Sequence, residues 1–249
     1  VFNNQRLSKV KNYTYVRFNI ESSGNLLHLI SLMTNKNKYQ EIDSTGNIQA
    51  EYYNFLNTRY AQYIKSDFEY SHSFSIDKFN SIVARTFFGI GIPYGNFDVL
   101  HFEKKYFTGG ANGIRAWPVR SLGPGTYKAS PEDYPNQTAD IKLEGNLEYR
   151  FKLIAFVEGA LFLDVGNIWA INEKDNRPGA LFKLNSFYKQ LALGTGTGLR
   201  MDLTYFILRL DLGMKLRDPS ESDNRGWIIG NRQITNNDFN FTFAIGYPF

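Results

Sequence analysis

Residues 141–151 read IKLEGNLEYRF, and their side chains alternate in character along the whole stretch. The odd positions are apolar, aromatic or glycine, whereas the even positions carry Lys142, Glu144, Asn146, Glu148 and Arg150. A period of two places successive side chains on opposite faces of a β-strand. The length also matches the roughly 9–11 residues that a tilted strand needs to cross a bilayer. The stretch therefore predicts a strand with one apolar and one charged face.

The same design recurs along the chain. It is clearest at 206–217 and 238–249, weaker at 16–21 and 64–70, and plausible at 47–55, 82–92, 154–165 and 191–203. A further strand is expected at 26–33, which gives roughly ten strands in all. Short links such as 150–153 alternate with long polar links such as 170–189 and 218–238. This order of strands and links is typical of an antiparallel up-and-down sheet.

The two faces of these strands decide between a soluble sheet and a membrane barrel. Several strands set three or four ionisable residues against an almost unbroken Leu/Phe stripe. In water, such strands would need either a charged core or an outer surface of Leu and Phe, and both are costly. A barrel that turns its apolar face to lipid and its polar face to a wet lumen removes the conflict. The sequence thus predicts an all-β, transmembrane, antiparallel up-and-down β-barrel.

The composition narrows the possible chemistry. The 249 residues include 21 Phe and 16 Tyr but no cysteine, so disulfides and thiolate metal sites are excluded. The three histidines, His28, His72 and His101, lack ligand spacing, and we expect neither a metal nor another cofactor. The net charge of +4 is dispersed rather than clustered, which argues against a nucleic-acid partner. A transmembrane helix is not expected, because no run of about 18 apolar residues occurs.

Glycine repeats at every second position of residues 194–198, as a G-x-G-x-G run. A nucleotide loop would require a helix pattern after these glycines, and none follows. Two interpretations remain. Gly194, Gly196 and Gly198 mark either a bend of the sheet or a bare patch of wall that another segment approaches closely.

One link differs from the others because it is long and rich in both glycine and large side chains. Residues 107–131 read FTGGANGIRAWPVRSLGPGTYKASP. Long loops in a compact fold are usually functional or disordered, and the apolar anchors within this one argue for order. We therefore expect a loop that folds onto the barrel.

This loop resembles that of the bacterial surface antigen superfamily, which includes the BamA-like outer-membrane assembly barrels and the two-partner secretion transporters. The family signature is an aromatic residue and Gly-Gly, then hydrophobic-Arg-Gly-aromatic, then Gly-Pro. The matching residues here are Phe107, Gly109, Gly110, Ile114, Arg115, Trp117, Gly123 and Pro124. Ala116 replaces the glycine of the signature. An aromatic-x-Asp-x-Gly motif in a later strand is matched by Phe162, Asp164 and Gly166, and five strands are expected after the loop, as in the family.

The resemblance implies roles for these residues. The arginine that corresponds to Arg115 enters the lumen and pairs with the aspartate that corresponds to Asp164. Glu148 is a second candidate partner, because alternation turns it inward on the neighbouring strand. The alternative is that Arg115 is an ordinary solvent-exposed arginine of a loop. The alternating aromatic and apolar residues at the end of the chain, Phe243, Ile245, Tyr247 and Phe249, resemble the family's insertion signal.

The resemblance also implies an organisation and a function. Residues 1–249 are expected to be the C-terminal part of a sixteen-strand barrel that follows periplasmic transport-associated domains, with 107–131 as an inserted lumen loop. A self-contained ten-strand barrel is the alternative. We expect a non-enzymatic protein, integral to a Gram-negative-type outer membrane, that inserts or translocates polypeptides. Its expected partners are outer-membrane lipid, lipopolysaccharide, client polypeptides and accessory assembly proteins.

Two other function classes remain open. A passive porin would keep its lumen empty, so ion conductance with and without 107–131 separates a porin from a barrel whose loop fills the lumen. An outer-membrane hydrolase would need a defined Ser/His/acid set, and no such set can be singled out.

Overall fold

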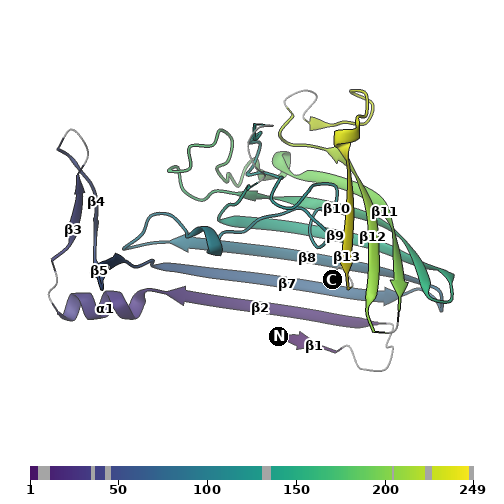
Figure 1. Ribbon diagram of the computed structural model, residues 1–249, viewed down its shortest axis with the longest axis horizontal. Coiled ribbons are helices and arrows are strands. Elements are labelled where there is room, and N and C mark those ends of the chain that lie inside the picture. Colours follow the sequence, from purple (N-terminus) through teal and green to yellow (C-terminus); the bar gives the residue numbers. More distant parts are fainter. Residues whose placement is uncertain are drawn as a thin grey trace.

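One antiparallel sheet dominates the computed structural model, which describes residues 1–4, 12–34, 37–42, 46–130, 136–203, 205–221 and 226–246 (Figure 1). Within this part of the chain the sheet has nine strands in the order β1-β2-β7-β8-β9-β10-β11-β12-β13. They are β1 (Phe2–Asn3), β2 (Tyr13–Ser23), β7 (Tyr63–Ser75), β8 (Asn80–Pro93), β9 (Ile141–Ile154), β10 (Val157–Trp169), β11 (Ala192–Asp202), β12 (Ile207–Arg217) and β13 (Phe239–Ile245). The sheet is open in this chain, because β1 and β13 are not hydrogen-bonded to each other.

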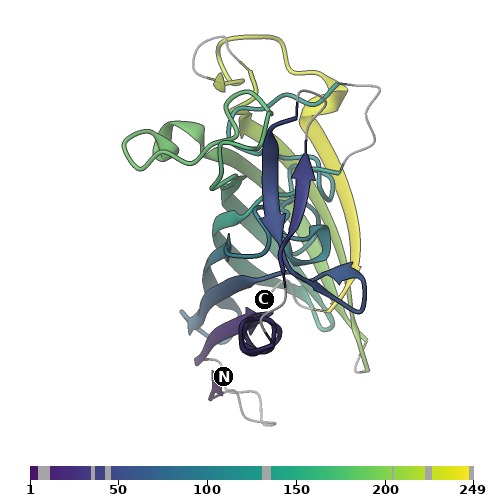
Figure 2. The same cartoon turned by 90° about the vertical axis from the view of Figure 1, so that its left-hand side faces the viewer.

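Alternation of the side chains determines the two faces of the sheet. On β10, Leu161 and Leu163 are 51% and 41% exposed, whereas Phe162 and Asp164 between and beside them are 3% and 0% exposed. Figure 2 shows the sheet curving from β2 round to β13, with the segment between β8 and β9 on its inner side. The exposed apolar face is therefore the outer one, and the predicted all-β membrane-barrel fold is confirmed.

The connections differ in length at the two ends of the strands. Residues 76–79, 155–156 and 203–206 are short turns at one end, whereas 94–140, 170–191 and 218–238 are long links at the other. In outer-membrane barrels the short turns are periplasmic and the long loops extracellular. The described parts of the long links include the short 3-10 helices η1 (Phe102–Lys104), η2 (Phe187–Gln190) and η4 (Asn236–Asp238).

The region between β2 and β7 differs from the prediction. Residues expected as a strand at 26–33 form the helix α1 (Asn25–Met33). Its buried Ser31 lies beneath Tyr60, whose hydroxyl is 3.5 Å from Ser31 Oγ. The segment is apolar on nearly every side, so its periodicity cannot distinguish a helix from a strand.

The segment predicted at 47–55 does form a strand, but not in the main sheet. β4 (Ile48–Tyr52) pairs with β3 (Tyr39–Ile42), and β5 (Asn54–Phe55) pairs with β6 (Thr58–Arg59). The β3–β4 hairpin stands upright beyond the end of β2 (Figure 1). The main sheet therefore has fewer long strands than the roughly ten expected. Of the helices in the described ranges, none is long and apolar enough to cross a membrane.

Candidate functional site: a loop bound to the inner face of the sheet

The candidate site lies where residues 107–130 meet the inner face of β9 to β13. Alternation along β9 and β10 turns Asn146, Glu148, Phe162 and Asp164 to this face, and the register places Glu148 opposite Phe162 and Asn146 opposite Asp164. Glu148 and Asp164 are fully buried. Two carboxylates thus lie side by side on neighbouring strands, and a rigid sheet holds both.

Arg115 of the loop binds both carboxylates. Its Nε donates to Asp164 Oδ2 and its Nη2 to Asp164 Oδ1, each at 2.9 Å, while its Nη1 donates to Glu148. The backbone N–H of Arg115 also donates to Asp164 Oδ2, at 3.0 Å. The planar guanidinium matches a carboxylate through two parallel bonds, which fixes both its position and its orientation. The structure therefore brings Arg115, Asp164 and Glu148 together and leaves Arg115 fully buried.

Further groups complete the surroundings of this pair. Glu148 also accepts from Arg150 Nε at 2.7 Å and from Arg200 Nη2 at 2.9 Å, and Asn146 Nδ2 donates to Asp164 Oδ1 at 2.9 Å. The Arg115 guanidinium lies 3.6 Å from the centre of the Phe162 ring. A buried charge that keeps several partners is tolerated, whereas removing one partner leaves the others uncompensated. The arrangement is a buried ionic cluster rather than a solvent-exposed salt bridge.

The apolar side of the loop packs onto a bare area of the wall. Ile114, Ala116, Trp117 and Leu122 form a buried cluster with Ala192 of β11. The wall next to this cluster is glycine, and a Cβ atom at Gly194 would lie 2.7 Å from the Ala116 Cβ. A Cβ at Gly213 of β12 would lie 2.8 Å from the Ala116 Cα. The close-approach interpretation of the glycine run therefore holds for Gly194.

The other two glycines of the run serve the wall itself. A Cβ at Gly196 would lie 2.4 Å from the Phe162 ring, and one at Gly198 would lie 2.1 Å from Asp211 Oδ1. These positions make room for inward side chains of the barrel rather than for the loop.

The remaining glycines of the motif shape the ends of the loop. The Gly110 N–H donates to the Trp117 carbonyl at 2.7 Å. Gly109 has a φ of 90°, and a Cβ atom there would lie 2.2 Å from the Pro118 carbonyl oxygen. At the C-terminal end of the loop, Gly123 and Pro124 are buried. A Cβ atom at Gly123 would lie only 2.4 Å from Asn167 Oδ1, so a side chain there would clash with β10.

Gly166 has a different neighbour from the rest of the motif. It pairs with Glu144, and a Cβ there would lie 2.2 Å from the Leu143 carbonyl oxygen. It accommodates β9 and does not contact the loop through any bond that the described residues show.

Several contacts of the loop were not identified from the sequence. Arg209 Nη2 donates to Asn112 Oδ1 at 3.0 Å, and Arg85 Nη1 donates to the Asn112 carbonyl at 3.3 Å. Asn240 of β13 donates from Nδ2 to the Arg115 carbonyl at 2.8 Å. Alternation along β12 turns the buried Arg209 to the inner face, but no local pattern specifies which part of the loop it contacts.

The residues of the expected insertion signal are divided. Phe243 and Ile245 lie on the outer face of β13, 59% and 67% exposed. Tyr247 and Phe249 lie outside the described residues, as does Pro131 at the end of the expected loop. The role of the terminal residues stays a prediction.

A curved antiparallel sheet, apolar outside and carrying on its inside a loop fixed by buried ion pairs, defines the wall of an outer-membrane type of β-barrel. The family model described as the Omp85 superfamily domain matches residues 41–249, and the chain therefore belongs to the Omp85 superfamily. Proteins of this superfamily are outer-membrane barrels that insert or translocate polypeptides and are not enzymes.

One solved structure agrees at the level of the fold. The crystal structure of BamA from Haemophilus ducreyi lacking POTRA domains 1–3 is similar with a TM-score of 0.53 and 14% identity. The similarity covers 95% of this chain and 51% of that one, so the chain spans about half the length of the BamA structure. CdiB from Acinetobacter baumannii is similar with a TM-score of 0.43 and 16% identity, over 75% of this chain and 27% of that one. None of the curated proteins compared with the chain matches it.

Proposed function

We propose that this chain is the C-terminal part of an outer-membrane barrel that inserts or exports polypeptides, with residues 107–131 as a loop fixed inside the lumen. The observation that carries the proposal is the buried contact of Arg115 with Asp164 and Glu148, each of them fully buried. The proposed partners are outer-membrane lipid and lipopolysaccharide outside, client polypeptides, and periplasmic transport-associated domains or accessory assembly proteins.

The proposed mechanism needs no covalent chemistry. β13 pairs with β12 on one side, and in the described part of the chain no strand pairs with its other side. Such an edge offers a row of backbone donors and acceptors to an incoming strand. A client strand that adds here gains backbone hydrogen bonds while its apolar side chains join the outer face formed by Phe241 and Phe243.

The fixed loop fills and supports the inside of the sheet, which a passive channel would leave open to water. Its side chains occupy the inner face of β9 to β12, where a porin would hold water. We propose that the loop braces the wall from inside, so that the edge can open without collapse of the rest of the sheet. The same occupancy argues against a porin.

Replacement of Arg115 tests the proposal. Arg115→Ala leaves Asp164 and Glu148 buried without their shared partner, a loss of about 3–5 kcal/mol for a buried pair. We expect the loop to become sensitive to protease and client assembly or export to fall at least tenfold, while the barrel still reaches the membrane. Arg115→Lys should restore little, because a lysine cannot make the parallel bonds of a guanidinium.

Arg120→Ala is the matched control. Arg120 lies in the same loop and contacts the rings of Phe102 and Phe107 rather than a carboxylate. It should leave client assembly near normal. Normal client assembly by Arg115→Ala, with a loop shown to be released, would contradict the proposed role of the loop.

A further inference from the structure

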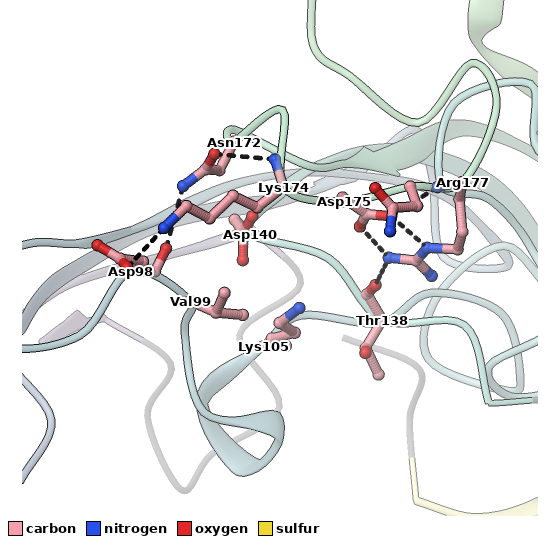
Figure 3. Close-up of a pocket in the computed structure, with 10 residues that line it drawn as sticks. Asp98, Val99, Lys105, Thr138, Asp140, Asn172, Lys174, Asp175 and Arg177 are labelled. Carbon is pink, nitrogen blue, oxygen red and sulfur yellow. Dashed lines mark hydrogen bonds and ion pairs between the residues drawn. The ribbon is translucent and has the colours of Figure 1, made fainter. Parts of the chain in front are cut away.

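A hollow of about 340 Å³ lies at the long-loop ends of β8, β9 and β10, away from the buried ionic cluster (Figure 3). Its lining comes from two links. The link between β8 and β9 contributes Asp98, Val99 and Lys105, and also Thr138 and Asp140 just before β9; the link between β10 and β11 contributes Asn172, Lys174, Asp175, Asn176 and Arg177. Asp140 lies at the centre of this hollow.

Four of the charges that line the hollow are already paired. Lys174 Nζ lies 2.5 Å from Asp98 Oδ2, and Arg177 holds Asp175 through Nε at 2.9 Å and Nη2 at 2.5 Å. Figure 3 shows the first pair on one side of Asp140 and the second on the other. Within each pair the two opposite charges compensate each other, and the two pairs form opposite walls of the hollow.

Asp140 between them is held rigidly and lacks one partner. Its backbone N–H donates to the Trp169 carbonyl at 3.0 Å, and its own carbonyl accepts from Gly91 at 2.8 Å. The side chain is on a residue only 5% exposed, and its Oδ2 accepts from Ile171 N–H at 3.1 Å. Its Oδ1 has no hydrogen-bond partner among the described residues. Burial raises the pKa of this carboxyl group, as expected when a carboxylate loses water without gaining enough donors.

Lys105 is the complementary group. It lines the same hollow, half-buried, and acts electrostatically on Asp140. No hydrogen bond or ion pair of its ammonium group occurs among the described residues, so it does not reach Asp140. Asp140 and Lys105 therefore line one hollow without binding each other. Counting Asp98, Asp140 and Asp175 against Lys105, Lys174 and Arg177, the lining carries three charges of each sign and no net charge.

We propose that this hollow binds a small zwitterion, whose ammonium group donates to Asp140 Oδ1 and whose anionic group pairs with Lys105. A buried polar atom without a partner is costly, and a charged donor is the strongest partner for a carboxylate. The balanced lining disfavours ligands of high net charge, because a polyphosphate would meet three carboxylates. A bare cation would meet three basic groups, and no group of acids in the described residues has the arrangement of a metal site. A free amino acid and a phosphoethanolamine headgroup share the required chemistry.

Binding of two soluble zwitterions tests the proposal. The full chain in nanodiscs without phosphatidylethanolamine is titrated calorimetrically with glycine and with O-phosphoethanolamine, and separately with ethylamine and acetate as the two halves. At least one zwitterion should bind at least tenfold more tightly than either half. Preference for O-phosphoethanolamine, together with its displacement by nanodiscs that contain phosphatidylethanolamine, identifies a headgroup, whereas preference for glycine identifies a free amino acid.

Three variants assign the contacts. Asp140→Asn keeps an acceptor for Ile171 N–H, and Lys105→Gln keeps the length of the side chain closely, so both should fold. Each should weaken zwitterion binding at least tenfold. Lys128→Gln is the matched control, since it removes a lysine whose partner Glu221, like Lys128 itself, does not line the hollow, and it should change binding less than twofold. Failure of both zwitterions to bind better than their halves, or unchanged binding by Asp140→Asn and Lys105→Gln, would overturn the proposal.

Discussion

Ala116 sets the distance between the loop and the barrel wall. The resembled signature has glycine here, and this chain carries one methyl group more. The structure shows where that methyl fits, because it points at Gly194, which has no side chain to meet it. The two positions therefore share one small volume, and only one of them can carry a Cβ atom.

Exchange of this methyl group is the first prediction. Gly194→Ala should place two Cβ atoms about 2.7 Å apart and displace the loop. Overpacking of this kind costs about 1–3 kcal/mol. The double variant Gly194→Ala/Ala116→Gly should recover most of the loss, because the methyl has only changed sides. Protease sensitivity of the loop and urea unfolding measure both effects, and a double variant no better than Gly194→Ala would show that the clash lies elsewhere.

The pairing of Asp238 with Arg232 makes one long link sensitive to acid. Arg232 donates to both oxygens of Asp238, at 2.7 and 2.6 Å, and Thr235 adds its N–H at 2.7 Å. Arg232 first, and Thr235 with it, hold the pKa of Asp238 at about 2, below the ordinary 3.8. A lowered pKa means that the ionised group stabilises the fold above the ordinary value. That stabilisation is lost as the pH falls from 3.8 through about 2.

We therefore expect the link before β13 to loosen over that pH interval. Trp227 lies in the same link and reports on it, as the difference in emission between the protein and its Trp227→Phe variant. Asp238→Asn should remove the acid transition, because it has no proton to gain. An acid transition of equal size in Asp238→Asn would assign the change to another group.

At the scale of single residues, the sequence predicted the orientation of side chains that lie in regular strands. Alternation alone turned Glu148 and Asp164 inward, and the resemblance supplied Arg115 as their partner. Asn240 was not predicted, because its bond to Arg115 joins positions 125 residues apart. The bonds of Arg200 to Glu148 were not predicted either, since they cross the intervening strand β10 and depend on the curvature of the sheet. Local patterns specify a face, and they do not specify which loop atom meets it.

At the scale of elements, the strands after the loop were predicted well and the region before it less well. β9 to β12 have both alternation and charge to mark them, so their positions follow from the period alone. α1 has no charged residue, and its helical form depends on tertiary packing beneath Tyr60 and on the turn at Gly24, whose φ is 80°. The β3–β4 hairpin has strand periodicity but pairs with itself, and the period does not reveal the partner of a strand.

The last strand and the loop are joined directly, which gives a prediction for β13. Asn240→Ala removes the bond to the Arg115 carbonyl, worth about 0.5–1.5 kcal/mol. We expect β13 to exchange its amide hydrogens faster and the loop to be cleaved faster by protease. Thr242→Ala is the control, because Thr242 lies two residues along on the same face and its hydroxyl has no partner in the described part of the chain. Equal effects of the two variants would show that only strand propensity had changed.

At the scale of the whole molecule, the two faces of the sheet require different solvents. Phe18 and Asn19 are neighbours in the middle of β2 and point to opposite faces; Phe18 is 57% exposed, and Asn19 Nδ2 bonds to Asp67 Oδ2 at 2.8 Å. Not every inward position would tolerate an introduced arginine, however. Asp211 is buried between Arg200 and Arg209, so an arginine there would meet two cations in a dry place.

A pair of arginine variants tests which face meets lipid. Phe18→Arg should lower the free energy of unfolding in bilayers by about 2–4 kcal/mol. Asn19→Arg should lower it far less, because the new charge faces Asp67 across the strand pair. Urea titrations of the two variants in the same lipid measure the difference. Equal losses would contradict an apolar outer face in lipid.

The position of the loop in the sequence determines when it can bind to the sheet during folding. Three groups that bind Arg115 belong to strands that follow it in the chain: Glu148 is 33 residues later, Asp164 is 49 and Asn240 is 125. Contacts between distant positions form late, since the intervening chain must first be ordered. The bonds of Arg115 to these strands are therefore expected to form late in folding. The bond to Asn240 forms only after β13 has joined the sheet. We expect a chain truncated before β13 to lack the Asn240 bond and therefore to hold the loop less firmly.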